Sequence, residues 1–415
     1  MLRRLVALDL WEPLKGWSFR RLWSAAGLSM LADQAFLVAL TWLVLRLAGS
    51  GAELGAVLAV ASIPGAILMP VGGVLSDRAS PVMIMVGASV GRVVLLALLA
   101  ALILTGEIRL WHVYVISAGL SALDALYYPA SMAIVPALVG QDRLGAANAM
   151  IQGVEQASSI LGPALAGLLL ALAGLGASFG GTAILFLIAT ALFVTLARAA
   201  DQVAGPAEDQ EQEDEQGTMG GGLVEGLRYV VRDPVIRTLL LVVLGTNLAM
   251  MGPLYVGGAV LAESRLGGAG AFGTLVAAAG SGSLIGIIGA GSTRRFARRG
   301  LIELSLTGVL GIVVASIAFV PNLAFAVPLA IAIGATASFL GVITISWLQE
   351  RTEPALLGRV MSLVMFSAVA LDPISFALAG VLVEVNLAAT FVGAGALLVL
   401  TASLGATSRT MRLAG

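Results

Sequence analysis

The 415-residue sequence predicts an all-α membrane protein with twelve transmembrane helices in two pseudo-symmetric six-helix halves. Three observations support this prediction: the apolar composition, the number of long apolar segments and an internal repeat. Hydrophobic residues make up 59% of the chain and charged residues 11%, and the mean hydropathy is +1.00. Such a chain has too little polar surface to cover soluble domains of this total length. We therefore expect a multi-pass protein of the cell membrane, in contact with lipid.

Apolar segments long enough to cross a bilayer as a helix, about 20 residues each, occur twelve times. They lack the alternating pattern, roughly ten residues long, of barrel strands, so we expect helices, which satisfy their own backbone groups in lipid. The 51 glycines suit close helix packing in a membrane. The predicted spans are 18–47, 54–75, 82–104, 111–139, 145–174, 179–198, 235–261, 270–292, 301–320, 322–348, 356–384 and 387–407.

A short acidic segment divides the chain into halves that repeat each other. Residues 201–222 contain acids and a glycine run but no base, a composition that predicts a solvated linker. We expect a first bundle over 1–200 and a second over 223–415, which begins with an amphipathic helix. The sequence GVLSDR at 73–78 aligns with GAGSTR at 289–294, and ALAGLL at 164–169 aligns with ALAGVL at 377–382. The offsets, 216 and 213 residues, match a parallel six-plus-six arrangement.

Basic residues predict the orientation of the chain in the membrane. If the N-terminus is cytoplasmic, 19 of the 23 lysines and arginines fall on cytoplasmic segments. Only Arg46, Arg109 and Arg265 lie on the other side, and Arg92 lies inside the third predicted span. Because positive residues favour the cytoplasmic side, both termini are expected there.

Several chemistries have no support in the sequence. The chain has no cysteine, which excludes disulfides and thiolate sites, and its one histidine, His112, is expected at the outer end of a span. No phosphate-binding loop of the GxxxxGK[ST] type occurs, so ATP is not the expected energy source. The basic run at 294–299 is expected to face lipid headgroups rather than nucleic acid. We therefore expect no enzyme activity, metal, cofactor or nucleic-acid partner.

Acidic residues inside the predicted spans are the strongest functional signal. An ionised carboxylate at bilayer depth costs roughly 3 kcal/mol even on insertion scales, so such acids are usually functional. Along 111–139, Ser117, Ser121, Asp124, Tyr128 and Ser131 follow helical steps of three and four residues. Gln152, Glu155, Ser159 and Gly162 do the same in the next span. Gln34 follows Asp33, and Asp372 precedes Pro373.

Motifs in order along the chain resemble the major facilitator superfamily. GGVLSDRASP after the second span is similar to that family's signature between spans 2 and 3, with Gly73, Leu75, Asp77 and Arg78 matching. Four further segments are similar to sequences of the branch of macrolide and enterobactin exporters. They are WSFRRLWSAAGLSMLADQ, YYPASMAIVPALV, EGLRYVVRDPVIRTLLL and LQERTEPALLGRVMSL. Gly162, Pro163 and Gly167 keep part of the span 5 motif found in exporters of the superfamily.

The resemblance implies roles for these residues. Asp77, with Gly73 and Arg78, would take part in the conformational cycle. Spans 1, 4, 5, 7, 8, 10 and 11 would line a central cavity. The cavity and coupling residues would then be Asp33, Gln34, Asp124, Tyr128, Gln152, Glu155 and Asp372. Two structural alternatives stay open: Asp124 could pair with Arg92 or Arg143, and Asp372 could cap a broken helix.

The predicted function is secondary active transport by a monomer: export of amphipathic small molecules, such as drugs or siderophore-like metabolites, coupled to protons or sodium. Burial penalises the charged form of a carboxylate, so acids in the cavity could bind and release protons as water access alternates. One alternative is a facilitator or importer of small polar solutes. A second, of another class, is a non-transporting membrane scaffold or sensor.

Overall fold

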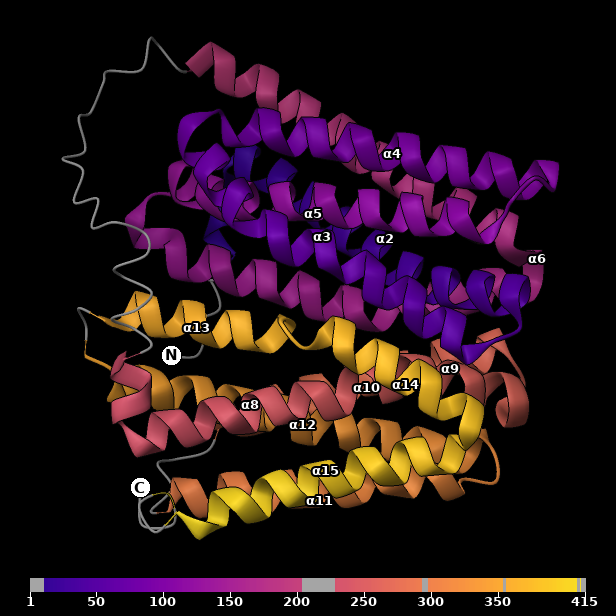
Figure 1. Cartoon of the computed structure of the whole chain (residues 1–415). Helices are drawn as coiled ribbons and strands as arrows, with labels where there is room; N and C mark the ends of the chain where they lie inside the picture. The colour runs from indigo at the N-terminus through magenta and orange to yellow at the C-terminus, as the bar shows by residue number, and fades with distance from the viewer. Residues whose placement is uncertain (1–10, 204–227, 293–297, 354–355, 409–410, 412–415) are drawn as a thin grey trace. The chain divides into compact units, whose positions relative to one another are not determined.

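The computed structural model describes the chain except for residues 1–10, 204–227, 293–297, 354–355, 409–410 and 412–415 (Figure 1). Every described element is a helix, and no strand occurs among the described residues. The predicted fold class, an all-α membrane protein, is therefore confirmed. The acidic part of the predicted linker lies outside the described residues.

The helices of the first half follow the predicted spans closely. After the short η1 (Glu12–Lys15) come α2 (Trp17–Ala48), α3 (Gly51–Arg78), α4 (Pro81–Thr105), α5 (Leu110–Val139), η2 (Gln141–Arg143) and α6 (Leu144–Val203). The chain of α6 turns back at Gly174, whose φ of 75° is readily adopted only by glycine. Its two legs therefore correspond to two of the predicted spans.

The second half is more interrupted. It contains α8 (Pro234–Gly252), the π-helical η3 (Pro253–Gly257), α9 (Gly258–Leu261), the π-helical η4 (Ala262–Leu266), α10 (Ala269–Ser292), α11 (Arg299–Ser316) and η5 (Ile317–Phe319). These are followed by α12 (Leu323–Arg351), α13 (Leu357–Val369), α14 (Asp372–Val385) and α15 (Leu387–Thr407). The predicted span 356–384 is therefore two helices, separated just before Asp372.

Among the described residues, 10 helical segments are long and apolar enough to cross a membrane. The number is lower than the predicted twelve for two reasons. The segment Leu144–Arg198 holds two predicted spans joined through Gly174, and α13 and α14 are each shorter than 18 residues. The multi-pass character is shown, whereas the count of twelve stays a prediction.

The helices form two compact units that exchange short segments. Unit 1 comprises 1–49, 60–208 and 269–277, and unit 2 comprises 50–59, 209–268 and 278–415. The first turns of α3 thus pack with the later helices, and the first turns of α10 pack with the earlier ones. The predicted bundle boundaries, 1–200 and 223–415, do not include this exchange and stay predictions.

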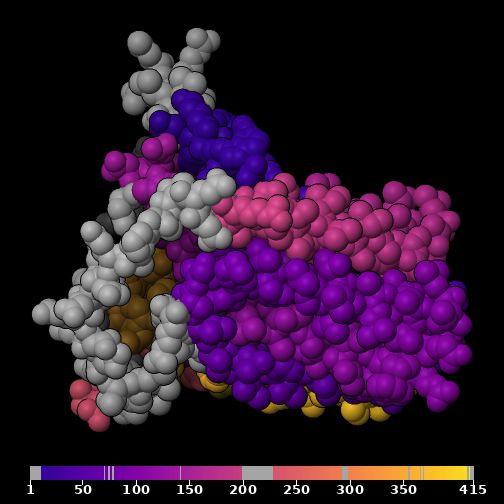
Figure 2. Space-filling view, turned by 90° about the horizontal axis from the view of Figure 1, so that it is seen from above, coloured from indigo at the N-terminus to yellow at the C-terminus, as the bar shows by residue number. Residues whose placement is uncertain are grey.

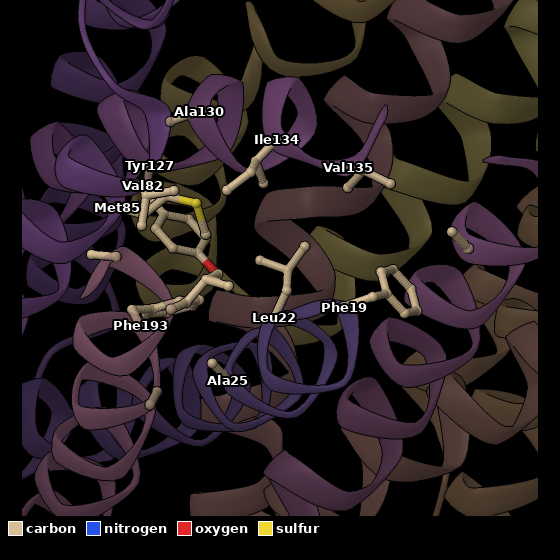
Figure 3. Packing of buried hydrophobic residues seen from close by; sticks show 14 of the residues in the cluster. Phe19, Leu22, Ala25, Val82, Met85, Tyr127, Ala130, Ile134, Val135 and Phe193 are labelled. Atoms are coloured by element: carbon tan, nitrogen blue, oxygen red, sulfur yellow. The ribbon is translucent and has the colours of Figure 1, made fainter. Parts of the chain in front are cut away.

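A buried apolar cluster holds unit 1 together. Phe19 and Leu22 of α2, Met85 of α4, Tyr127 of α5 and Phe193 of α6 belong to it (Figure 3). The Tyr127 ring lies edge-on to Phe193, with ring centroids 5.9 Å apart. These contacts fix α2, α4, α5 and α6 around the residues described below.

The outer surface of unit 1 is apolar, as a lipid-facing surface must be. In the view of Figure 2, α4 and the second leg of α6 form much of this face. The exposed large side chains of these two helices include Val90, Val94, Leu98, Ile184, Leu187 and Ile188. In water such a surface would cause aggregation, but in a bilayer it is expected.

Two equivalent glycine contacts allow helices to touch at their backbones. A Cβ atom on Gly273 of α10 would lie 2.6 Å from the Pro163 carbonyl oxygen and 2.9 Å from Gly167 Cα, both in α6. A Cβ atom on Gly55 of α3 would lie 2.4 Å from the Phe376 carbonyl oxygen and 2.8 Å from Gly380 Cα, both in α14. Gly167 and Gly380 are the glycines of the repeated ALAG sequence, so the repeat marks a contact present once in each unit.

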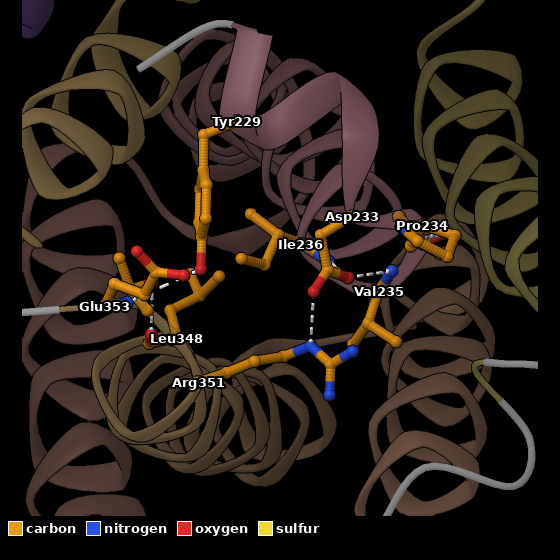
Figure 4. A network of polar contacts seen from close by, with 10 residues as sticks. Tyr229, Asp233, Pro234, Val235, Ile236, Leu348, Arg351 and Glu353 are labelled. Carbon is orange, nitrogen blue, oxygen red and sulfur yellow. Dashed lines mark hydrogen bonds and ion pairs between the residues drawn. The ribbon is translucent and has the colours of Figure 1, made fainter. Parts of the chain in front are cut away.

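A polar cluster in unit 2 fixes the start of α8 against the end of α12 (Figure 4). The Asp233 carboxylate accepts hydrogen bonds from the amides of Val235 (2.8 Å) and Ile236 (3.2 Å), and it pairs with Arg351 Nε at 2.8 Å. The amide of Glu353 donates to the hydroxyl of Tyr229. Of the predicted amphipathic helix before α8, only 228–232 is described, and Val230 is buried there whereas Val231 is exposed.

The Asp233 carboxylate, which caps the start of α8, is expected to make a pH-dependent contribution to stability. Burial works against ionisation of Asp233, but the hydrogen bonds from Arg351, Ile236 and Val235 outweigh it and lower the pKa of this carboxyl. Its contribution is therefore fully present above the unfolded pKa of about 3.9 and is lost as pH falls through the lower folded value. We expect Asp233→Ala to lower the free energy of unfolding by about 1 kcal/mol at neutral pH.

Thermal unfolding of purified protein measures this difference. Asp233→Asn is the matched control, because its side-chain oxygen still caps α8, and it should lose less stability than the alanine variant. Equal unfolding temperatures for wild type and Asp233→Ala would contradict the assigned role.

Candidate functional site

A cavity of about 600 Å³ lies in unit 1 between α2, α5 and the first leg of α6. Five of the predicted site residues line it: Asp33, Gln34, Tyr128, Gln152 and Glu155. They lie on three different helices, so the sequence patterns in these spans do converge on one site. Tyr128 and Ser131, from the polar face predicted on α5, both reach the cavity.

The remaining wall of the cavity is mostly apolar. It is formed by Leu22, Ala26, Met30, Tyr127, Met132, Val135, Pro136, Leu144 and Ile151, with Asn148 as a further polar group. Met30 and Met132 supply flexible thioether side chains, which adapt to ligands of different shape. Small-molecule sites usually have a largely apolar wall with a few polar groups, as this cavity does.

A fully buried arginine lies beside the cavity. Arg92 of α4 is 0% exposed and pairs with Asp124 of α5, whose side chain is 34% exposed. Its NH1 donates to the hydroxyl of Ser29 at 3.3 Å, and its guanidinium carbon lies 4.3 Å from the centroid of the Tyr127 ring. Of the two partners considered from the sequence for Asp124, Arg92 is thus the one observed.

The charges around the cavity do not cancel. Asp33 lies close enough to Arg92 and Asp124 for the three charges to act on one another. With Glu155 on the cavity wall, the described site contains three carboxyl groups and one guanidinium, and the guanidinium is the group farthest from solvent. When all three acids are ionised, the site carries an excess of negative charge.

The predicted residues of α6 separate into two roles. Glu155 and Gln152 line the cavity, and both side chains are exposed. Gly162 instead packs on α2, where a Cβ atom would lie 2.6 Å from Gln34 Cβ. Pro163 and Gly167 meet α10, and α6 stays helical through Pro163. The span 5 motif therefore positions two neighbouring helices.

Asp372 belongs to unit 2. It lies in the first turn of α14, immediately after the helix break, but its side chain makes no capping hydrogen bond. Its Oδ1 is buried and has no hydrogen-bond partner among the described residues. Tyr255 of η3 is a close electrostatic neighbour. The alternative of a capping residue is therefore not supported, and a role for Asp372 in transport stays a prediction.

One buried acid, Glu303, was not among the residues predicted from the sequence. Glu303 of α11 is 2% exposed and accepts a hydrogen bond of 2.6 Å from the hydroxyl of Thr344 in α12. Its position inside the predicted span 301–320 could have identified it. Of the predicted motif after the second span, Gly73, Asp77 and Arg78 belong to the last turns of α3, but their side chains lie outside the described residues.

The Arg92–Asp124 pair predicts a characteristic mutant pattern. Arg92→Leu leaves Asp124 without its partner and should lower the free energy of unfolding by on the order of 3 kcal/mol. The double variant Arg92→Leu, Asp124→Leu removes both charges and should recover most of this loss. Thermal unfolding in detergent provides the comparison, and a double variant no more stable than Arg92→Leu would refute the pairing.

Comparisons with known proteins agree with this architecture. A family model described as Major Facilitator Superfamily matches residues 22–371. The Enterobactin exporter EntS of Shigella boydii serotype 18 is 28% identical over 271 residues, which cover 65% of this chain and 60% of the exporter. EntS of Escherichia coli O139:H28 matches over the same length. The chain therefore aligns with only about 60% of the length of these curated relatives.

Solved transporters share the fold at low sequence identity. A peptide transporter POT in complex with sulfate has a TM-score of 0.73 and 15% identity, with 94% of each chain covered. The nucleoside transporter NupG has a TM-score of 0.70 and 13% identity, with 94% of this chain and 98% of that chain covered. The family match covers most of the chain and the curated relatives are named as exporters, so the protein belongs to the Major Facilitator Superfamily and is a transporter rather than an enzyme.

Proposed function

We propose that this transporter exports amphipathic small molecules in exchange for protons. The observation that supports the proposal best is the cavity of unit 1, where three carboxyl groups and one buried arginine adjoin an apolar, methionine-containing wall. The apolar wall suits the body of an amphipathic molecule. The excess of acids supplies groups that can exchange protons with water during alternating access.

Proton coupling follows from the position of the acids. Arg92 can balance only one negative charge, so Asp33 and Asp124 together hold one more charge than their local partner neutralises. Binding a proton removes that excess, and access to water from the opposite side returns it. Sodium is the alternative coupling ion, since carboxylates also bind hard cations.

Export is favoured over import by the similarity to exporters named for enterobactin and by the retained span 5 motif. A facilitator of polar solutes would need more polar groups in the cavity than this wall offers. A non-transporting scaffold would not need three acids at a cavity. We also propose that both termini are cytoplasmic, as the loop charges predict, and that the protein is a monomer.

The first test concerns coupling. Asp33→Asn and Glu155→Gln keep side-chain size but cannot titrate, so each should lower efflux driven by a pH gradient at least about tenfold, while substrate binding is partly retained. The measurement is efflux from proteoliposomes, with Glu12→Gln, a half-buried acid outside the cavity, as control. Unchanged efflux in the Asp33→Asn, Glu155→Gln double variant would remove these acids from the coupling mechanism.

The second test concerns the charge of the substrate. Because no base lines the described cavity, a lipophilic cation should bind better than an anion of the same shape. Tetraphenylphosphonium and tetraphenylborate form such a pair. We expect the cation to bind at least about tenfold more tightly, and Asp33→Asn and Glu155→Gln to reduce this preference. Titration calorimetry on purified protein measures both affinities, and equal or reversed affinities would contradict the proposed cavity electrostatics.

A further inference from the structure

The start of α3 is held by a carboxylate from a distant part of the chain. Glu384, at the end of α14, accepts hydrogen bonds at Oε1 from the Ser50 hydroxyl (3.0 Å), the Gly51 amide (2.6 Å) and the Ala52 amide (3.2 Å). The first amides of a helix have no partner within it and carry a partial positive charge. An ionised carboxylate is therefore a well-matched partner at this end of α3.

Glycine contacts bring the carboxylate into position. A Cβ atom on Gly51 would lie 2.4 Å from Val383 Cγ2, and Gly55, one turn later, meets the backbone of α14 at Gly380. The first turns of α3 consequently belong to unit 2, whereas the rest of the helix belongs to unit 1. The contact joins a helix of the predicted first bundle to a helix of the second, at the predicted outer side of the membrane.

The equivalent contact in the repeat lacks the carboxylate. In the register that aligns Gly167 with Gly380, Pro163 corresponds to Phe376 and Ala171 corresponds to Glu384. Ala171 does lie opposite the start of α10, where a Cβ atom on Gly270 would be 4.0 Å from Ala171 Cβ. A methyl group cannot accept a hydrogen bond, so the two equivalent helix crossings share their glycine packing but differ in this polar clamp.

We infer that Glu384 is a positioning residue for the transport cycle, a latch that stabilises the state in which the outer ends of α3 and α14 are together. Alternating access requires helices of the two bundles to separate on one side of the membrane at a time. Opening at the outer side must break three hydrogen bonds at the α3–α14 crossing. Among the described residues, the α6–α10 crossing has no hydrogen bond of this kind. The inference rests on transport by alternating access and is independent of direction, substrate and coupling ion.

The test measures the distance between the outer ends directly. The chain contains no cysteine, so spin labels can be attached to Arg46→Cys at the end of α2 and Glu263→Cys in η4, both exposed and one in each unit. Double electron–electron resonance on the full chain in lipid nanodiscs then gives the distance distribution. Glu384→Ala removes three hydrogen bonds and should increase the ratio of the longer to the shorter component by at least roughly tenfold, the effect of losing a single charge-assisted hydrogen bond.

The repeat supplies a matched rescue variant. Ala171→Glu places a carboxylate at the equivalent crossing, so the double variant Glu384→Ala, Ala171→Glu should return the distribution towards the wild-type one. If Glu384→Ala does not fold, Glu384→Gln, which keeps an acceptor oxygen but no charge, should give a smaller shift in the same direction. A purely structural role would lower the unfolding temperature and leave the distribution unchanged; that outcome, or a failure of Ala171→Glu to rescue, overturns the inference.

Discussion

Arg92 is buried in α4 with no exposed surface, and the arrangement of the cavity depends on how its charge is balanced. A buried charge is tolerated only with close partners, because its hydration has been lost. Asp124 supplies the opposite charge, Ser29 accepts a hydrogen bond and the ring of Tyr127 covers one face of the guanidinium. These partners come from α2 and α5, so a single cation fixes three helices next to the cavity. It also sets the electrostatic potential in which Asp33 must titrate.

This arrangement explains why the acids have different roles. Asp124 contacts the arginine directly, and Asp33 lies within its field but also lines the cavity. Glu155 of α6 is exposed on the cavity wall and forms no ion pair among the described residues. A proton or a cationic ligand arriving in the cavity therefore meets Asp33 and Glu155 before it meets Asp124. Coupling through Asp33 would be transmitted to the packing of the helices because Arg92 shares its charge between Asp33 and Asp124.

The sequence predicted most of the helices and the helix faces on which several cavity residues lie, because both depend on periodic patterns. Apolar length located the spans, and helical spacing placed Tyr128, Gln152 and Glu155 on the faces that line the cavity. It could not show whether Arg92 or Arg143 would pair with Asp124, since that depends on how α4 is rotated against α5. Glu303 could have been identified from its position inside a predicted span, but its hydrogen bond from Thr344 depends on how α11 packs against α12. The break before Asp372 follows from Pro373, but the surroundings of that carboxyl depend on tertiary packing.

The repeated glycines show how the same constraint produces both symmetry and difference. In lipid, helices gain little from burying apolar side chains against each other, so close backbone contact is a main source of their attraction. Gly55 with Gly380, and Gly273 with Gly167, satisfy this requirement in the same way in each unit. Once the backbones touch, the residue one turn beyond the glycine lies beside the first amides of the neighbouring helix. At that position the chain places Glu384 in one repeat and Ala171 in the other, so a single side chain makes two otherwise equivalent crossings unequal. A transporter with two identical crossings would have no built-in preference for which crossing separates. In this chain the hydrogen bonds of Glu384 provide such a preference.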